Sequence, residues 1–95
     1  MNYKLAWTQG FKRGFKKATR NNEPLQEKIF SVLDNLCNNP FDAKLKTHKL
    51  HGKLMGLWAC HVEYDCRIVF AFEKDPDLGN DLIVLIDIGK HDEVY

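Results

Sequence analysis

The fold is decided by residues 57–72, LWACHVEYDCRIVFAF. We predict that residues 57–62 and 66–72 pair as an antiparallel hairpin through the three-residue loop Glu63-Tyr64-Asp65. This register opposes residues 62 and 66, 61 and 67, 60 and 68, and 58 and 70, and opposed residues share one face of a sheet. One face of the hairpin then carries only apolar side chains: Trp58, Cys60, Val62, Cys66, Ile68, Phe70 and Phe72. The alternation therefore predicts a strand pair with one buried face.

The other face of this hairpin places His61 beside Arg67. Arginine is a permanent cation whose planar fork suits a phosphate, and histidine gives or takes a proton near neutral pH. Two histidines and an acidic group near a phosphodiester suffice for general acid–base cleavage of RNA, with the 2′-hydroxyl as the nucleophile. Such chemistry requires no metal or other cofactor. A single histidine is more often structural, so the functional interpretation depends on several such residues meeting on one face.

The residues before this hairpin predict a short strand and two helices. Residues 3–7 alternate apolar and polar, and Thr8 can cap a helix over residues 9–20. Asn22 and Pro24 then begin a second helix, which Asn38-Asn39-Pro40 ends. Its apolar stripe consists of Leu25, Ile29, Val32 or Leu33, and Leu36. The short connection predicts that the two helices pack as an antiparallel pair.

The remaining segments are a basic loop over residues 41–54, a turn over 74–80 and a strand over 82–88. The strand is apolar on both faces up to Asp87, as a central strand would be. Two helices with a small, mainly antiparallel sheet make an α+β fold, and 95 residues make one domain over 1–95.

The composition is that of a soluble globular protein, with 44% hydrophobic and 28% charged residues. The longest aliphatic run, Leu82–Ile86, is too short to cross a bilayer, and the N-terminus lacks the apolar segment of a signal peptide. Three cysteines suggest no disulfide framework. We therefore expect a cytoplasmic protein with no membrane partner.

The net charge of +1 conceals a strong asymmetry. Residues 1–60 carry eleven Lys/Arg against four Asp/Glu, which gives +7, and residues 61–95 carry three against nine, which gives −6. A basic half can present a face to a polyanion, although an unevenly charged solvated surface has the same composition.

A zinc site is an alternative use of Cys60, His61 and Cys66. The hairpin register opposes it, because both cysteines face the apolar side and His61 faces away. The cysteines are better explained as small buried hydrophobic residues, and we predict no metal site.

Three segments together resemble the RelE/YafQ superfamily of bacterial type II toxins, the messenger-RNA-cleaving halves of toxin–antitoxin pairs. They are HKLHGKLMGLW (residues 48–58), HVEYDCRIVF (residues 61–70) and IGKHDEVY (residues 88–95). The resemblance is closest to the YafQ-like branch and covers most of the chain. It implies a RelE-like α+β fold, with two N-terminal helices on one face of a mainly antiparallel four-stranded sheet and an RNA site on the opposite face.

The resemblance also implies roles for individual residues. The proton-transfer candidates are His48, His61, Asp65 and His91, Arg67 is the phosphate clamp, and Tyr95 stacks on a base or orients a neighbour. The candidates for RNA binding are Lys44, Lys46, Lys49, Lys53 and Lys90. Two positions depart from the family pattern: Asp87 stands where YafQ-like members can carry an arginine, and Cys66 stands where an aromatic residue often occurs.

The sequence thus predicts a toxin that cleaves mRNA without a metal, at the ribosome, and that a cognate antitoxin protein binds in a hetero-oligomer. The alternative is a non-catalytic relative that binds nucleic acid or only assembles a regulatory complex.

Overall fold

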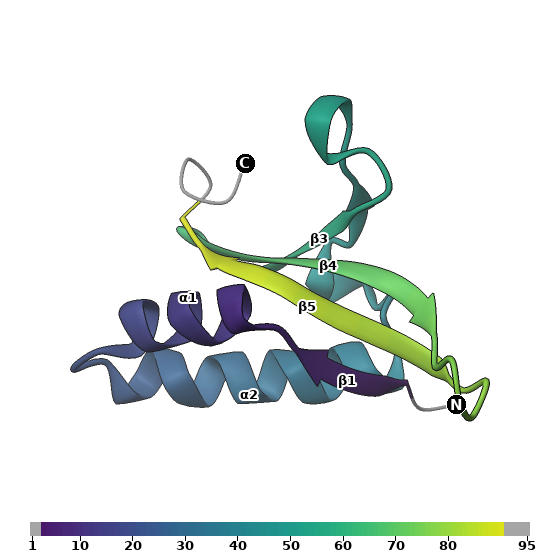
Figure 1. Cartoon of the computed structure of the whole chain (residues 1–95). Helices are drawn as coiled ribbons and strands as arrows, with labels where there is room; N and C mark the ends of the chain where they lie inside the picture. The colour runs from purple at the N-terminus through teal and green to yellow at the C-terminus, as the bar shows by residue number, and fades with distance from the viewer. Residues whose placement is uncertain (1–2, 91–95) are drawn as a thin grey trace.

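Residues 3–90 form two helices packed against one face of a five-stranded sheet in the computed structural model, which describes this part of the chain (Figure 1). The helices are α1 (Gln9–Thr19) and α2 (Glu23–Asn38), and the strands are β1 (Lys4–Trp7), β2 (His48–Lys49), β3 (Trp58–Glu63), β4 (Cys66–Lys74) and β5 (Asp81–Gly89). Their order in the sheet is β1-β5-β4-β3-β2, with β1 parallel to β5 and every other pair antiparallel. The predicted α+β class is confirmed, and β5 is a central strand as expected.

The β3–β4 hairpin follows the predicted register over most of its length. Trp58 opposes Phe70, Cys60 opposes Ile68 and His61 opposes Arg67. The predicted pairing of residues 62 and 66 is wrong, because Glu63 opposes Cys66. A bulge between His61 and Glu63 inserts one extra residue in β3, which shortens the turn from three residues to two. Val62 and Cys66 both remain buried, so the bulge changes the turn and preserves the apolar face.

The sheet has one strand more than the four expected, because β2 lies within the segment predicted to be a basic loop. This strand has only two residues, His48 opposite Ala59 and Lys49 opposite Trp58. Two 3-10 turns flank it, η1 (Ala43–Leu45) and η2 (Gly52–Leu54). A two-residue strand shows no alternation that a sequence pattern could reveal.

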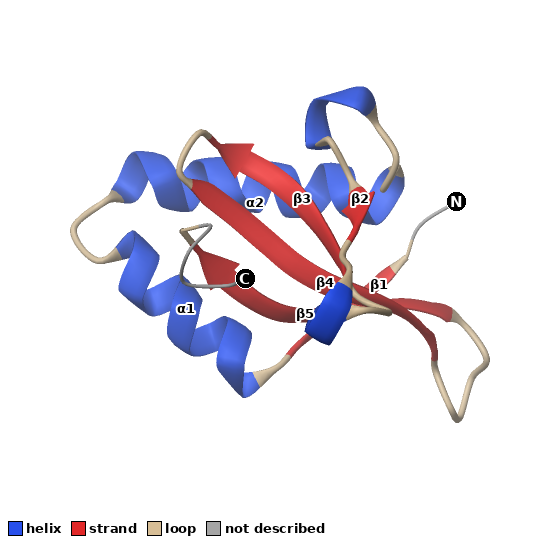
Figure 2. Cartoon of the chain, turned by 90° about the horizontal axis from the view of Figure 1, so that it is seen from above, coloured by secondary structure: helices blue, strands red, loops and turns tan. Residues whose placement is uncertain are grey.

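The predicted helix caps are present. The Thr8 hydroxyl accepts a hydrogen bond from the Phe11 N–H at 3.2 Å, and the Asn22 side chain accepts one from the Leu25 N–H at 3.2 Å. Between the helices and the sheet lies the main core, which includes the fully buried Phe11 and Phe70. Viewed from above, β3 and β4 pass in front of α2, and α1 lies beside β5 (Figure 2). Within the described residues, no helix has the length and apolar character that crossing a bilayer requires.

Two glycines allow α1 to approach β5 closely. A Cβ atom at Gly14 would lie 2.5 Å from the Ile88 carbonyl oxygen, and one at Gly10 would lie 3.0 Å from the Ile86 carbonyl oxygen. Any side chain at Gly14 would force the helix away from the strand. This contact fixes α1 against the sheet end where β5 finishes.

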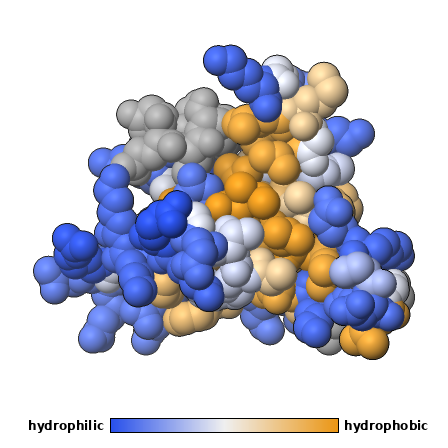
Figure 3. All heavy atoms as spheres, viewed as in Figure 1, coloured by the Kyte–Doolittle hydropathy of each residue, from blue (hydrophilic) through white to orange (hydrophobic). Residues whose placement is uncertain are grey.

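A smaller hydrophobic cluster covers the sheet face opposite the helices. Leu50, Ala59 and Val69 are buried there, and Leu54, Leu57 and Ile86 pack against them. Hydrophobic side chains gather over the middle of the molecule in the space-filling view (Figure 3). This cluster supports the loop that carries β2, and therefore holds His48 against the sheet.

Candidate active site

His61 and Arg67 stand side by side at the hairpin end of the sheet. They are direct cross-strand partners and both side chains are half-buried. The guanidinium of Arg67 donates a hydrogen bond from Nη1 to the Tyr64 carbonyl oxygen at 3.2 Å. This contact holds a permanent cation beside an imidazole, as the predicted register required.

His48 shares this face of the sheet. It opposes Ala59, so it is the diagonal neighbour of His61, and such neighbours in a sheet lie roughly 7–8 Å apart. Its Nδ1 lies 2.8 Å from the Lys46 carbonyl oxygen. Because a carbonyl only accepts, Nδ1 carries a proton, and Nε2 is the atom left for chemistry. The structure thus brings three of the predicted residues together: His48, His61 and Arg67.

The surroundings of His61 favour its neutral form. Burial lowers the pKa of the imidazole, and the positive charges of Lys46, Arg67 and Lys28 lower it further, whereas Glu63 acts in the opposite direction. Lys46 lies just before β2, whose His48 opposes Ala59 on the strand that carries His61. A neutral histidine among cations is suited to accept a proton near a bound anion.

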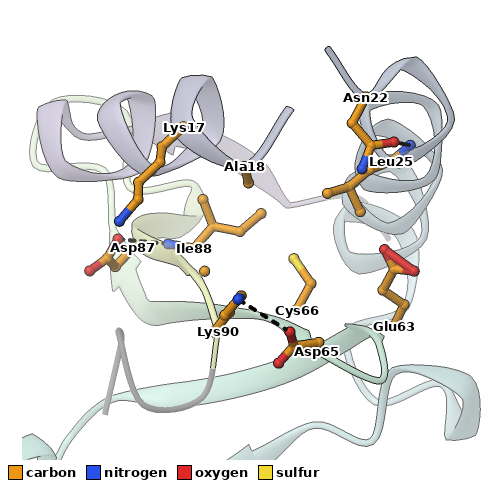
Figure 4. Close-up of a pocket in the computed structure, with 12 residues that line it drawn as sticks. Lys17, Ala18, Asn22, Leu25, Glu63, Asp65, Cys66, Asp87, Ile88 and Lys90 are labelled. Carbon is orange, nitrogen blue, oxygen red and sulfur yellow. Dashed lines mark hydrogen bonds and ion pairs between the residues drawn. The ribbon is translucent and has the colours of Figure 1, made fainter. Parts of the chain in front are cut away.

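Asp65 and Lys90 form an ion pair near the β3–β4 turn, since Asp65 lies in that turn and Lys90 directly follows β5. Lys90 Nζ is 3.8 Å from Asp65 Oδ2, and both side chains are exposed. They border a cavity of about 550 Å³ between the two helices and the ends of β4 and β5 (Figure 4). Cys66 also lines this cavity, and burial raises the pKa of its thiol to about 11. Asp65 lies in the turn between β3 and β4, where its recorded partner is Lys90.

Three of the other predicted RNA-binding lysines line two hollows of the surface, Lys49 and Lys53 one of them and Lys44 the other. Lys49 lies 5.5 Å from the centre of the Trp58 ring in a cation–π contact. Lys53 borders a shallow hollow of about 410 Å³ together with His48. Lys44 lines a separate groove, which also reaches His61. The lysines therefore surround the histidines and do not form one continuous stripe.

Two predicted site residues, His91 and Tyr95, lie outside the described residues. Within residues 3–90, no group of three or more His, Cys, Asp or Glu side chains is placed to hold a metal ion. Cys60 and Cys66 belong to the main core, and His61 stands on the other side of its strand, as the hairpin register predicted.

Lys28 is a residue that the sequence analysis missed. It lies on α2, borders the groove that reaches His61, and contributes to lowering the pKa of that histidine. The sequence feature that could have indicated Lys28 is its place on the polar side of the second helix, at helical spacing from Ser31 and Asn35.

Comparison with solved structures identifies the class of fold to which this arrangement belongs. The structure is similar to YafQ from E. coli strain BL21(DE3), with 19% identity over 98% of each chain and a TM-score of 0.77. It is also similar to the E. coli DinJ-YafQ complex, with 20% identity over 98% of each chain and a TM-score of 0.76. A metal-bound toxin from Helicobacter pylori is 25% identical over 100% of both chains, with a TM-score of 0.76. The fold is that of small bacterial toxins.

The sequence defines the family more narrowly. Residues 3–95 match the YafQ family, described as bacterial toxins of type II toxin-antitoxin systems, and the chain belongs to that family. A search of curated proteins finds no match. The expected relation to the RelE/YafQ superfamily is confirmed.

Proposed function

We propose that this protein is an endoribonuclease toxin that cleaves mRNA by general acid–base catalysis. The observation that carries the proposal is the cross-strand pair of His61 and Arg67, with His48 on the same face of the sheet. An imidazole kept neutral, a second imidazole and a fixed guanidinium are the groups that transesterification of a phosphodiester uses.

In the proposed reaction, His61 accepts the proton of the ribose 2′-hydroxyl. The 2′-oxygen then bonds to phosphorus, and the bond from phosphorus to the 5′-oxygen breaks. His48 acts as an imidazolium and donates its Nε2 proton to the leaving 5′-oxygen, while its Nδ1–H remains bonded to the Lys46 carbonyl, so that it ends as the neutral imidazole. Arg67 stabilises the negative charge that develops on the phosphoryl oxygens. The products are a 2′,3′-cyclic phosphate and a 5′-hydroxyl. The proposed reaction therefore consumes no cofactor.

The remaining predicted residues support the substrate in this proposal. Lys44, Lys46, Lys53 and Lys90 contact phosphates around the scissile bond, and Asp65, His91 and Tyr95 keep the roles that the family resemblance implies. Lys49 would have to leave the Trp58 ring to contact RNA.

The proposed partner is a cognate antitoxin protein, in a toxin–antitoxin hetero-oligomer. Family membership supports this, as does the similarity to a chain of a DinJ-YafQ complex. An mRNA substrate implies action in the bacterial cytoplasm, on messages at the ribosome.

The test is RNA cleavage by purified protein in EDTA, with analysis of the product ends. His61→Ala and Arg67→Ala should each lower the cleavage rate about 100-fold or more, the scale of general acid–base and charge-stabilising groups. Lys4→Ala is the matched control, because Lys4 is exposed on β1 at the opposite edge of the sheet.

Circular dichroism should show that all three variants keep the native fold. Full activity of His61→Ala and Arg67→Ala would refute the site. RNA binding without cleavage by the wild-type protein would instead support the non-catalytic alternative.

A further inference from the structure

A polar groove extends from His61 toward α2. It lies between α2, η1 and the end of β3, and has a volume of about 560 Å³. The residues that matter here are Lys28, Ser31, Asn35, Asn38, Lys44 and His61. His61 reaches this groove because β2 pairs only with Trp58 and Ala59 and leaves the rest of that edge of β3 without a strand partner among the described residues.

One stripe of α2 forms a wall of the groove. Lys28, Ser31, Asn35 and Asn38 follow one another at intervals of three, four and three residues, which places them on one side of a helix. The stripe offers an ammonium group, a hydroxyl and two amides. The amide of Asn38 donates one hydrogen bond to the Asp34 carbonyl at 3.0 Å, whereas the side chains of Ser31 and Asn35 make no hydrogen bond within residues 3–90.

The cations of the groove are available to an anion. Within residues 3–90, the side chains of Lys28 and Lys44 take part in no ion pair. Two carboxylates also line the groove, those of Asp34 and Asp42. Asp42 accepts a hydrogen bond from the Lys44 N–H at 2.9 Å, where it caps η1. A mixed lining of this kind is unlike a pure phosphate clamp and suits a strand that offers both phosphates and base edges.

We propose that this groove binds nucleotides of single-stranded RNA next to the scissile phosphate, with Lys28 on a backbone phosphate and Asn35 on a base edge. The inference rests on the proposed nuclease function, because it assumes that the scissile phosphate lies beside His61. A strand whose scissile phosphate lies between His61 and Arg67 has this groove immediately beside it. Lys28 and Asn35 thereby become substrate-positioning residues.

A peptide segment of a partner protein is the competing occupant. Peptide helices bind grooves through apolar anchor side chains. Of the apolar residues in this groove, Leu45 and Val62 are buried and leave only Val32 partly accessible. The lining therefore favours a nucleic acid strand over a peptide.

The experiment measures the binding of a fluorescent, fully 2′-O-methylated RNA octamer, which has no nucleophile and cannot be cleaved. Anisotropy titrations over a range of salt concentrations give the affinity and its salt dependence. We expect Lys28→Gln to weaken binding about fivefold or more, and to reduce the slope of log affinity against log salt by about 0.7, the value for one phosphate contact on a single strand. Lys4→Gln is the matched control and should change neither quantity.

A second measurement tests the base contact. Asn35→Ala should change the relative cleavage rates of RNA substrates that differ at one nucleotide beside the cut, and should leave the salt slope unchanged. Shortening the octamer on the side that occupies the groove should abolish the effect of Lys28→Gln.

The outcomes separate the groove from the nuclease function. If wild-type protein cleaves RNA and Lys28→Gln matches Lys4→Gln in binding and cleavage, the groove proposal is wrong and the nuclease proposal stands. If wild-type protein cleaves nothing but binds the octamer through Lys28, the groove is an RNA site and the nuclease proposal is wrong. Failure to bind or cleave overturns both. Loss of antitoxin binding alone in Lys28→Gln would assign the groove to a peptide.

Discussion

At the scale of single residues, His61 shows how the surroundings of a side chain change its pKa. Burial is the largest cause that lowers its pKa, and the charges of Lys46 between η1 and β2, Arg67 on β4 and Lys28 on α2 lower it further. A histidine at the same sequence position in an exposed loop would titrate near 6.5. The fold therefore favours the neutral form of His61, which the proposed RNA cleavage would require.

The lowered pKa of His61 predicts how stability depends on pH. Because the unfolded imidazole binds a proton more readily than the folded one, the free energy of unfolding falls as pH drops below about 6.5. Above that pH, both states are neutral and this contribution is complete. Urea unfolding between pH 7 and pH 5 should show a larger loss of stability in the wild type than in His61→Gln, which cannot titrate. Equal losses would show that the pKa of His61 is not lowered in the folded protein.

At the scale of elements, the β3–β4 hairpin shows what a sequence pattern can predict and where it fails. The alternation of apolar and polar residues correctly predicted that His61 opposes Arg67. The bulge between His61 and Glu63 was not predictable, because Val62 remains buried whether the turn has two residues or three. The pattern records which face is buried, and the turn geometry depends on local hydrogen bonding.

The contact between α1 and β5 leads to a prediction at the same scale. Gly14→Ala would gain about 1 kcal/mol of helix propensity, yet its Cβ would lie 2.5 Å from the Ile88 carbonyl oxygen. The helix must move, so we expect a net loss of about 1–3 kcal/mol in the free energy of unfolding. Gly10→Ala is the matched control in the same helix, because its Cβ would lie 3.0 Å from the nearest backbone oxygen and should cost less.

Urea denaturation of both variants measures these losses. A Gly14→Ala protein as stable as the wild type would mean that α1 can separate from β5 without cost. Such a result would also weaken the view that α1 holds the end of β5 in place.

At the scale of the whole molecule, the candidate site combines segments that are far apart in sequence. Lys28 comes from α2, His48 from β2, and His61 and Arg67 from the hairpin. All four are found near one edge and end of the sheet, where the helix, the β2 loop and the hairpin meet. The basic half of the chain supplies both edge strands of the sheet, β1 and β2, and the acidic half supplies the inner strands β4 and β5.

The cysteines give a prediction about opening of the whole molecule. Burial raises the pKa of the Cys60 thiol to about 12 and that of Cys66 to about 11, so neither forms the reactive thiolate near neutral pH. We expect a disulfide reagent to label Cys37, which is half-buried, well before the other two. Cys60 and Cys66 should react only through unfolding, and all three should react at once in denaturant.

Mass spectrometry after timed labelling identifies which cysteine has reacted. Cys37→Ser should abolish the fast phase and serves as the control. Fast labelling of Cys66 in the native protein would show that the cavity it lines opens without global unfolding.

The sequence by itself determined the α+β class, the helix caps, the buried face of the hairpin and the pairing of His61 with Arg67. These features depend on local periodicity and on neighbours within one hairpin, which a single sequence records directly. It also carried the three segments that resemble RelE/YafQ toxins, and the match of residues 3–95 to the YafQ family confirms that relation.

Only the tertiary structure decided that β2 forms a fifth strand and places His48 on the same face of the sheet as His61. It also paired Asp65 with Lys90 and brought Lys28 of α2 to the groove beside His61. Each of these results depends on packing between segments that are more than ten residues apart in the sequence. Sequence periodicity describes the buried side of an element, and it does not specify which distant element will cover that side or border the site.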